Sequence, residues 1–590
     1  MFFRNRLKII KGKVIDVSTA ECPLTGIKIN LYAVRDVKLH QDEEEAVKLV
    51  DKKHIFTAKT DKNGEFLFIL RDGTYSLNVD VSSLPDGKCI NNAGKVIRNR
   101  DFEYVSFKIN DFKLPDREAI QSQNTANHLS TIEKIMHSRN MGEIDDKEKI
   151  QYLLKVLFNN RNSDNAYQSK IPDKSGTTAV EEVYRYIESE NADSGILNSA
   201  KRLLGSHIPS LDKNYISPSG YFNIHYTLAG PNAVTVQSGS RKSVPSYIKE
   251  IGVAFDKAKN ITCGVRGFRE PVLEAGINTY DVYVIDLMGK YGITLPRNFY
   301  LQKSGSRTAS SYICIDNSYS KSKGFQKSRE DCMSVTAAHE FFHSVQYAYN
   351  YDADSWWKEA SATWNEDEVY RGINDYIRYL NSYFSAPYRP LDKSSYSGVV
   401  FVKYLSEYCG GYNIVKNIWE TQSKGILNSI EAIDRALKES TEGQDLSQVF
   451  SRFAAFNINP AQYYNEGKLW NAEVLLNNSH KEYPVSVNSG KMEHLSSNYI
   501  SFEASDHGNK PLKIVVSNAS QGKCGFKLQK RKKADKSYQM TDINIDRTYS
   551  EAEITVKNFG KVYDRICLIP CSLEFTKDIS AYSYSAQPDE

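Results

Sequence analysis

The sequence has no apolar run that could cross a bilayer. No window of its 590 residues approaches the ~20 consecutive apolar residues that a membrane-spanning helix needs. The first ten residues carry positive charge but lack the apolar stretch of about 7–15 residues that defines a secretory signal. We therefore expect no transmembrane segment. For the chain as written we also expect no secretory signal, which keeps a cytoplasmic location open.

Paired cysteines and an excess of one charge are missing as well. The nine cysteines are scattered, without a CxxC pair or a Cys/His cluster, and their odd number leaves at least one unpaired in a monomer. We expect a mostly reduced chain rather than a disulfide scaffold. The 76 basic and 72 acidic side chains give a net charge of +4, which exerts no general attraction on nucleic acid. No nucleic-acid partner is expected.

The sequence does contain an HExxH zinc signature, with His339 and His343 around Glu340. On a helix, positions i and i+4 lie one above the other on the same face, so the two imidazoles can bind one metal ion. Glu340 would then point toward a water on that ion. The same helix has an apolar stripe that predicts burial: Val335, Ala338, Phe342 and Val345.

A catalytic zinc ion needs a third protein ligand and an open position for water. Fifteen residues lie between His343 and Glu359, and the polar stretch 350–354 among them predicts a turn. A second helix can therefore bring Glu359 against the first. Two histidines and one glutamate are the ligand set of thermolysin-type zinc peptidases. The alternative for Glu359 is an ordinary helix carboxylate.

Several sequence blocks resemble a known family. AAHEFFHSVQYAY, WWKEASATWNEDEVY, NDYIRYL and YSGVVFVKYLSEYCGG are similar to the MXAN_6640-type metalloproteases, gluzincin-like proteins of bacterial surfaces and secretions. SPSGYFNIHYTLAGPNAV, VPSYIKEIGVAFDKA and TYDVYVIDL extend the likeness, which covers roughly residues 145–480. The resemblance implies one zinc ion per chain held by His339, His343 and Glu359, Glu340 as catalytic base, and a secreted or cell-surface location.

Two further residues are candidates for the site. Tyr396 resembles the tyrosine of the YxxG block in aminopeptidase-like members, although the spacing is one residue shorter, and it is a candidate oxyanion donor. Aromatic packing is the alternative. Glu366 lies seven positions beyond Glu359 on the same helical face and could orient a ligand histidine. The thermolysin pattern has an aspartate where this chain has Thr363, so an exposed Glu366 is the alternative.

The periodicity of apolar residues predicts a multidomain α+β chain. Alternation predicts strands in residues 1–115, similar to a transthyretin-like or carboxypeptidase-regulatory β-sandwich. Residues 116–212 have helical periodicity and form either a supporting layer or an inhibitory pro-region over the cleft. Residues 213–480 are expected to form a zincin-type catalytic domain with a mixed sheet, the active-site helix and a helical lower lobe. Residues 481–590 return to strands and predict a second, C-terminal β-sandwich.

Within the catalytic domain, the stretch 311–315 is a candidate for the strand that pairs with an extended substrate, with a plain interior strand as the alternative. Together these features predict a zinc-dependent endopeptidase that acts on a protein or peptide, with Glu340 as general base. Two alternatives compete: a zinc hydrolase of a non-peptide substrate, and a surface or adhesion protein whose central domain is catalytically idle. The intact HExxH motif with Glu359 argues against the idle protein.

Overall fold

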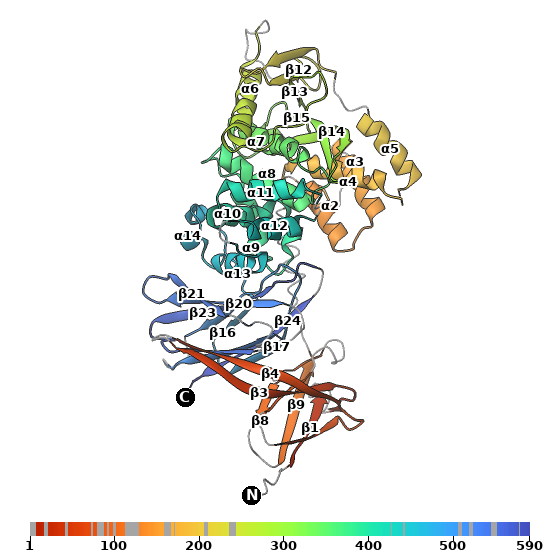
Figure 1. Cartoon of the computed structure of the whole chain (residues 1–590). Helices are drawn as coiled ribbons and strands as arrows, with labels where there is room; N and C mark the ends of the chain where they lie inside the picture. The colour runs from red at the N-terminus through yellow and green to blue at the C-terminus, as the bar shows by residue number, and fades with distance from the viewer. Residues whose placement is uncertain are drawn as a thin grey trace. The chain divides into compact units, whose positions relative to one another are not determined.

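The structure of the protein is a computed structural model (Figure 1). It describes residues 7–16, 22–41, 45–71, 75–79, 88–90, 94–97, 102–111, 129–158, 167–169, 171–190, 192–205, 210–234, 243–425, 428–440, 443–504, 510–518, 523–543, 545, 551–576 and 579–589. The chain divides into two compact units. The first contains residues 1–117, 384–391 and 446–590, and the second contains residues 118–383 and 392–445. It is a multidomain protein of mixed α/β structure with several sheets.

The second unit is built on a six-stranded mixed sheet in the order β10-β14-β15-β13-β12-β11. β14 pairs antiparallel with β15, whereas β15, β13 and β12 run parallel. The mixed sheet that the sequence predicts within residues 213–480 is thus present, although β10 lies before this range. The bounds of the six are β10 (Asp173–Ser175), β11 (Lys213–Ile216), β12 (Phe222–Tyr226), β13 (Tyr280–Ile285), β14 (Lys290–Leu301) and β15 (Arg307–Asp316).

The substrate-pairing role predicted for the stretch 311–315 is wrong. These residues belong to β15, and β15 lies inside the sheet between β13 and β14. Both of its edges are therefore occupied by neighbouring strands, as the alternative interpretation held. Beyond β15 lies β14, which the sequence did not predict. The short strand β10 pairs parallel with β14 and forms the edge of the sheet.

Helices cover both faces of this sheet. Apolar side chains of α3 and α4, such as Leu153, Ala179 and Val183, share one buried core with Ile293 and Leu295 of β14. The helices of this layer are α2 (Thr131–Asn140), α3 (Asp146–Phe158), α4 (Thr177–Glu188) and α5 (Ser194–Gly205). They fall within the predicted helical region 116–212 and pack on the sheet as one layer.

The other face carries α6 (Ser246–Lys259), continued by a π-helical turn at Asn260–Val265, and α7 (Arg329–Tyr347). At the start of α7, the Ser328 hydroxyl accepts a hydrogen bond from the Asp331 amide. The negative charges of Glu330 and Asp331 lie in the first turn, where they interact favourably with the positive end of the helix dipole. A short polar turn then leads into α8 (Ser355–Val369). The remaining helical elements are α9 (Ile377–Phe384), short 3-10 turns at Leu391–Lys393 and Ser395–Gly398, α10 (Val399–Tyr408), α11 (Tyr412–Gln422) and α12 (Ser429–Lys438).

The first unit is built from three sheets. A five-stranded sheet has the order β2-β1-β9-β7 with β5 on β1, and a second has the order β16-β18-β23-β20-β21. The third has eight strands in the order β17-β24-β19-β22-β4-β3-β6-β8. The N-terminal strands are β1 (Leu7–Asp16), β2 (Cys22–Pro23), β3 (Lys28–Gln41), β4 (Glu45–Lys59), β5 (Glu65–Arg71), β6 (Tyr75–Val79), β7 (Lys88–Ile90), β8 (Gly94–Ile97) and β9 (Phe102–Asp111).

The C-terminal strands of this unit enclose one apolar core between two sheets. Phe502, Leu528 and Ile566 contribute from one sheet, and Ile514 and Ile554 contribute from the other. The bounds are β16 (Asn478–His480), β17 (Val485–Met492), β18 (Ile500–Glu503), β19 (Leu512–Asn518), β20 (Cys524–Lys532), β21 (Tyr538–Ile543), β22 (Glu551–Val556), β23 (Tyr563–Ser572) and β24 (Ser580–Pro588). β4 pairs antiparallel with β22, so N-terminal and C-terminal strands share the eight-stranded sheet.

The two units divide the chain differently from the four domains expected from the sequence. Residues 446–480 belong to the first unit, because α13 (Leu446–Phe456) packs against its sheet and Gln529 donates a 3.0 Å hydrogen bond to the Ala455 carbonyl. α14 (Pro460–Tyr463) and the 3-10 turn Gly467–Leu469 follow α13. The helical layer of residues 129–205 belongs to the second unit.

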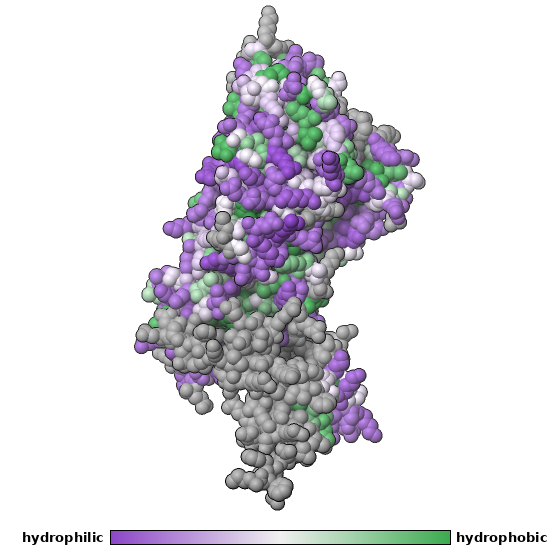
Figure 2. Space-filling view, viewed as in Figure 1, coloured by the Kyte–Doolittle hydropathy of each residue, from purple (hydrophilic) through white to green (hydrophobic). Residues whose placement is uncertain are grey.

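Two expectations about the whole chain can be compared with the described residues. No helix among them is long and apolar enough to span a bilayer, and the visible face of the second unit is largely hydrophilic (Figure 2). The cysteines whose side chains are described are free and buried, in agreement with a mostly reduced chain: Cys263, Cys314, Cys332, Cys409, Cys524, Cys567 and Cys571.

Candidate metal centre

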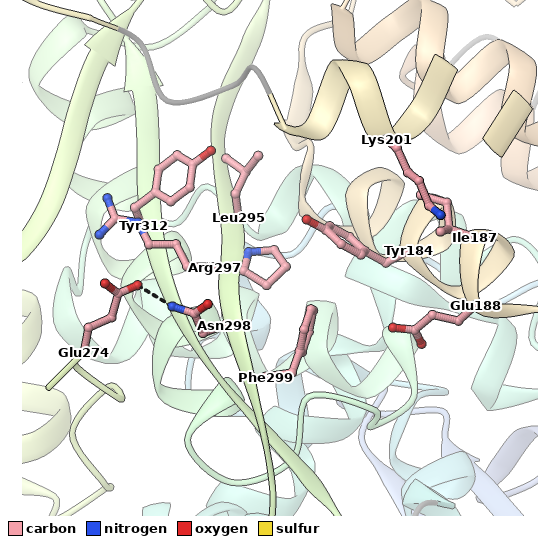
Figure 3. A pocket seen from close by; sticks show the side chains of 11 residues that line it. Tyr184, Ile187, Glu188, Lys201, Glu274, Leu295, Arg297, Asn298, Phe299 and Tyr312 are labelled. Atoms are coloured by element: carbon pink, nitrogen blue, oxygen red, sulfur yellow. Dashed lines mark hydrogen bonds between the residues drawn. The ribbon is translucent and has the colours of Figure 1, made fainter. Parts of the chain in front are cut away.

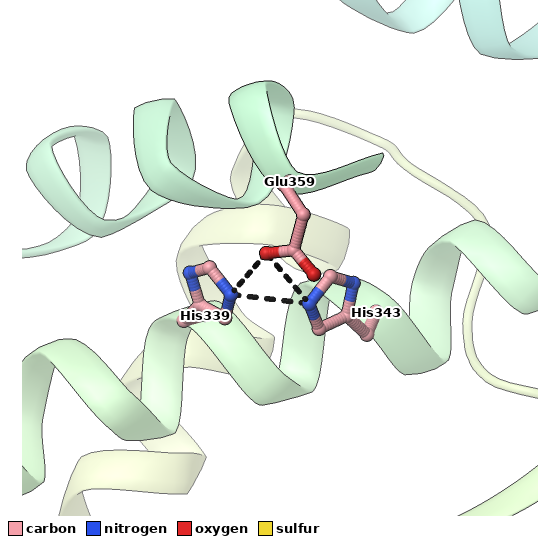
Figure 4. Close-up of side chains that lie close together, drawn as sticks. All are labelled: His339, His343 and Glu359. Carbon is pink, nitrogen blue, oxygen red and sulfur yellow. Dashed lines mark hydrogen bonds and ion pairs between the residues drawn. The ribbon is translucent and has the colours of Figure 1, made fainter. Parts of the chain in front are cut away.

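α7 and α8 bring the three predicted metal ligands together (Figure 4). Glu359 Oε2 lies 3.2 Å from His339 Nε2 and 3.6 Å from His343 Nε2. The two Nε2 atoms are 3.1 Å apart, and one ligand atom from each residue lies within 4.8 Å of the others. All three side chains are buried. The group could therefore bind a metal ion.

The other ring nitrogen of each histidine is held by a partner. His339 Nδ1 lies 2.7 Å from Glu366 Oε1, and His343 Nδ1 lies 2.8 Å from Gln346 Oε1. Because both oxygens only accept, we assign the proton of each neutral ring to Nδ1, which places the Nε2 lone pair of that neutral form toward Glu359. The predicted contact of Glu366 with His339 is confirmed, and the exposed alternative for Glu366 is wrong because its side chain is buried. That His339 is a metal ligand stays a prediction. Gln346 was missed, although it lies three positions after His343 on the same helix.

The electrostatics of the group favour a charged carboxylate. Burial by itself raises the pKa of Glu359, but the charge of His343 and hydrogen bonds from both histidines lower it well below the ordinary value. Burial likewise lowers the pKa of His339, yet its hydrogen bonds with Glu359 and Glu366 raise that pKa to about 9. Without a metal, His339 therefore carries an additional ring proton at neutral pH. A metal ion bound at this position would take the place of that proton.

Glu340 lies beside the ligands with its two oxygens in different surroundings. Oε2 accepts hydrogen bonds from the hydroxyls of Thr177 at 3.0 Å and Thr294 at 2.7 Å. Oε1 is buried and has no hydrogen-bond partner among the described residues. β14 approaches so closely that a Cβ on Gly292 would lie 2.5 Å from Glu340 Cγ, which explains the glycine.

The residues fit a zinc ion. Two imidazole nitrogens and one carboxylate oxygen form a donor set that suits zinc and leaves a fourth position for water. A buried carboxylate oxygen without a partner is costly, and a water beside a bound ion is a group that could satisfy Glu340 Oε1.

Residues 174–178, which include the end of β10 and the start of α4, supply contacts that no sequence pattern predicts. Lys174 Nζ lies 2.8 Å from Glu366 Oε2, and the Thr178 hydroxyl donates to Glu359 Oε1. With Thr177 on Glu340, one short stretch therefore reaches every carboxylate of the centre. The sequence carries no local signal for this, because the partners are more than 160 positions apart.

Tyr396 is buried close to the group. Its ring centroid lies 6.1 Å from that of His339 and 5.2 Å from that of Tyr379, and its hydroxyl is 3.5 Å from the Ser175 carbonyl oxygen. Burial raises its pKa far above the ordinary value. Both proposed features of this residue, proximity to the centre and aromatic packing, are therefore present together. Its role as oxyanion donor stays a prediction.

A separate cavity of about 770 Å³ lies between α4 and the far half of β14 (Figure 3). The rings of Tyr184 and Phe299 stand 5.7 Å apart in its wall. At its rim Asn298 donates a 2.8 Å hydrogen bond to Glu274. None of the three metal ligands lines this cavity.

Comparisons with models of protein families and with curated proteins find no match. Among solved structures, the minor pilin GBS52 of Streptococcus agalactiae is 18% identical over 19% of this chain and 48% of its own, with a TM-score of 0.15. The streptococcal ancillary pilin is 19% identical over 18% and 34%, with a TM-score of 0.14. The 9R-lipoxygenase from Cyanothece is 12% identical over 74% and 67%, with a TM-score of 0.13. The chain spans about half or less of either pilin, and TM-scores this low establish no shared fold.

Proposed function

We propose that the protein is a zinc-dependent peptidase whose centre is formed by His339, His343 and Glu359, with Glu340 as general base. The observation that carries the proposal is the convergence of the two imidazoles and Glu359 beside a carboxylate whose second oxygen has no partner among the described residues. Ligands and base come from one motif and the helix after it, so their spacing is fixed by backbone structure.

In this proposal the side chains divide the work. Zinc, when bound, supplies Lewis acidity and lowers the pKa of a water from about 15.7 to about 7. Glu340 Oε1 accepts a proton from the attacking water and passes it to the leaving amine, work that is typically worth ~10²–10⁴ in rate. Thr177 and Thr294 fix the other oxygen of Glu340 so that Oε1 stays in place.

The partners of the ligands have a role of their own. Glu366 and Gln346 hold the two imidazoles in one tautomer. Tyr396 is the proposed donor to the oxyanion, provided its hydroxyl leaves the Ser175 carbonyl.

We also propose that residues 213–480 contain a zincin-type catalytic domain related to the MXAN_6640-type metalloproteases. Three of the blocks that carry the resemblance fall on α7, α8 and α10, and the first two of these helices build the centre. The N-terminal and C-terminal strands, which share the eight-stranded sheet, then form an accessory β-unit. A secreted or cell-surface location follows from the same resemblance.

Zinc analysis and casein hydrolysis test the proposal together. We expect about one zinc ion per chain and near-complete loss of zinc in His343→Ala. Glu340→Gln should keep zinc while hydrolysis falls by ~10²-fold or more. Zinc binding without hydrolysis of any peptide would favour a hydrolase of another substrate or an idle domain. Full zinc retention in His343→Ala would refute the ligand assignment.

A further inference from the structure

The metal centre is closed to large molecules. His339, His343 and Glu340 are 0% exposed and Glu359 is 1% exposed. A peptide carbonyl must come within about 3–3.5 Å of an attacking water before reaction. A protein substrate therefore cannot enter unless some part of the chain moves.

The residues that close it come from one stretch. We define the closing segment as residues 173–188, which form β10 and α4. Along α4, Thr178, Glu181 and Arg185 occupy positions i, i+3 and i+7 and thus share one helical face. All three contact α8: the Thr178 hydroxyl donates to Glu359, Glu181 pairs with Lys358 at 2.7 Å, and Arg185 donates to the Ser355 hydroxyl at 2.8 Å.

The closing segment also forms hydrogen bonds with backbone groups of β14, the strand that contacts Glu340. The Gly176 amide donates to the carbonyl of Gly292 in β14 at 2.9 Å, and the Asp173 amide donates to the carbonyl of Gly289, the residue just before β14, at 3.1 Å. The Thr294 amide donates to the Thr177 hydroxyl at 2.9 Å. An extended peptide that adds to the edge of a sheet would need such backbone groups.

We propose that the closing segment is a built-in inhibitor of the metal centre, and that catalysis requires α4 and α8 to separate. This inference rests on the proposed peptidase function and concerns the regulation of the same site. The segment is poorly suited to be cleaved by the centre it covers. Over α4 its backbone groups are hydrogen-bonded within the helix rather than extended.

The opposite face of α4 defines the competing interpretation. Ala179, Val180 and Val183 pack in the core between the helical layer and the sheet, so α4 also supports the fold. If support were its only role, loosening its contacts with the rest of the second unit would lower activity. If it inhibits, loosening those contacts raises activity. The sign of the change separates the two.

The links at the exposed end of α4 allow this test without disturbing the core. Arg185 contacts Ser355, and Glu188 pairs with Arg307 at 2.9 Å; the Arg185 and Glu188 side chains are both 40% exposed. The experiment compares the zinc-loaded full chain with the double variant Arg185→Ala/Glu188→Ala. Lys147→Ala is the matched control, because it removes the exposed Lys147–Asp193 pair at 2.8 Å in the same helical layer.

Two rates are measured: removal of zinc by excess dipicolinate, and hydrolysis of casein. Exposed contacts of this kind are weak, so we expect the double variant to accelerate both by about twofold to about twentyfold. The control should match the unmodified chain, and Glu188→Gln alone should give a smaller increase of both rates.

Zinc removal at the control rate, or slower hydrolysis in the double variant, would overturn the inhibitor. Faster zinc removal with no hydrolysis by any of the proteins would support the closed centre while contradicting the proposed peptidase function. The two failures are therefore distinguishable.

Discussion

At the scale of single residues, the centre depends on atoms that hold ligands in place as much as on the ligands. Glu366 connects His339 to Lys174, whose Nζ lies 2.8 Å from both Glu366 and Asp375. A carboxylate behind a ligand histidine fixes its tautomer and raises its basicity. The affinity for zinc should therefore respond to a residue that never touches the metal.

Glu366→Gln tests this dependence. The amide keeps the size of the side chain but loses the charge behind His339, so the affinity for zinc should fall by about 10–100-fold. Competition with a chromophoric chelator measures the change. Glu368→Gln, two positions along α8, is the control and should leave the affinity unchanged, because Glu368 pairs with Arg266 instead. Equal affinities in both variants would mean that Glu366 only fills space.

Gly292→Ala tests the close approach of β14 to Glu340. The added methyl would lie 2.5 Å from Glu340 Cγ and 2.8 Å from a Thr336 methyl, so side chains or strand must shift. Such overpacking typically costs about 1–3 kcal/mol, and thermal unfolding should show it. Gly195→Ala is the control, because its methyl would have 3.3 Å to the nearest atom at the exposed start of α5. A melting temperature equal to that of the control would contradict the predicted clash.

At the scale of elements, the sequence predicts best where the signal is local. The apolar stripe and the spacing of His339 and His343 predicted α7, and the turn before Glu359 placed α8. The order of strands in the sheet could not be read in this way, because β14 enters between β10 and β15 through pairings that no local pattern records. Thr177 and Thr178 were missed for the same reason. Each is an ordinary first-turn residue of a helix until the fold brings it to a carboxylate.

The buried pair between α4 and α8 allows a prediction about how these helices are joined. Glu181 and Lys358 are both nearly fully buried, and Glu181 also accepts a 3.0 Å hydrogen bond from Tyr347. Glu181→Met alone leaves a buried lysine without its counter-ion and should cost about 3–5 kcal/mol in urea unfolding. Glu181→Met/Lys358→Met should cost less than either single change. A double variant with the summed cost would show that the charges do not interact.

At the scale of the whole molecule, the pairing of β4 with β22 raises the question of what the N-terminal strands contribute. The register joins Val47 to Ile554 and Val50 to Glu551. The metal ligands, by contrast, belong to the second unit, whose helical layer and sheet share their own core. Folding of the metal centre should therefore be independent of the N-terminal strands, whereas the solubility of the chain should not be.

A chain that begins at Lys113 tests this separation. It should bind zinc with the affinity of the full chain, because residues 118–383 and 392–445 remain complete. It should also self-associate as its concentration rises, since β22 loses β4 and exposes an unpaired edge. Zinc titration and analytical ultracentrifugation give the two readouts, with the full chain as control. Loss of zinc binding in a soluble truncated chain would mean that the N-terminal strands are required by the metal centre. A monomer at all concentrations would mean that the β4–β22 pairing protects no exposed edge in solution.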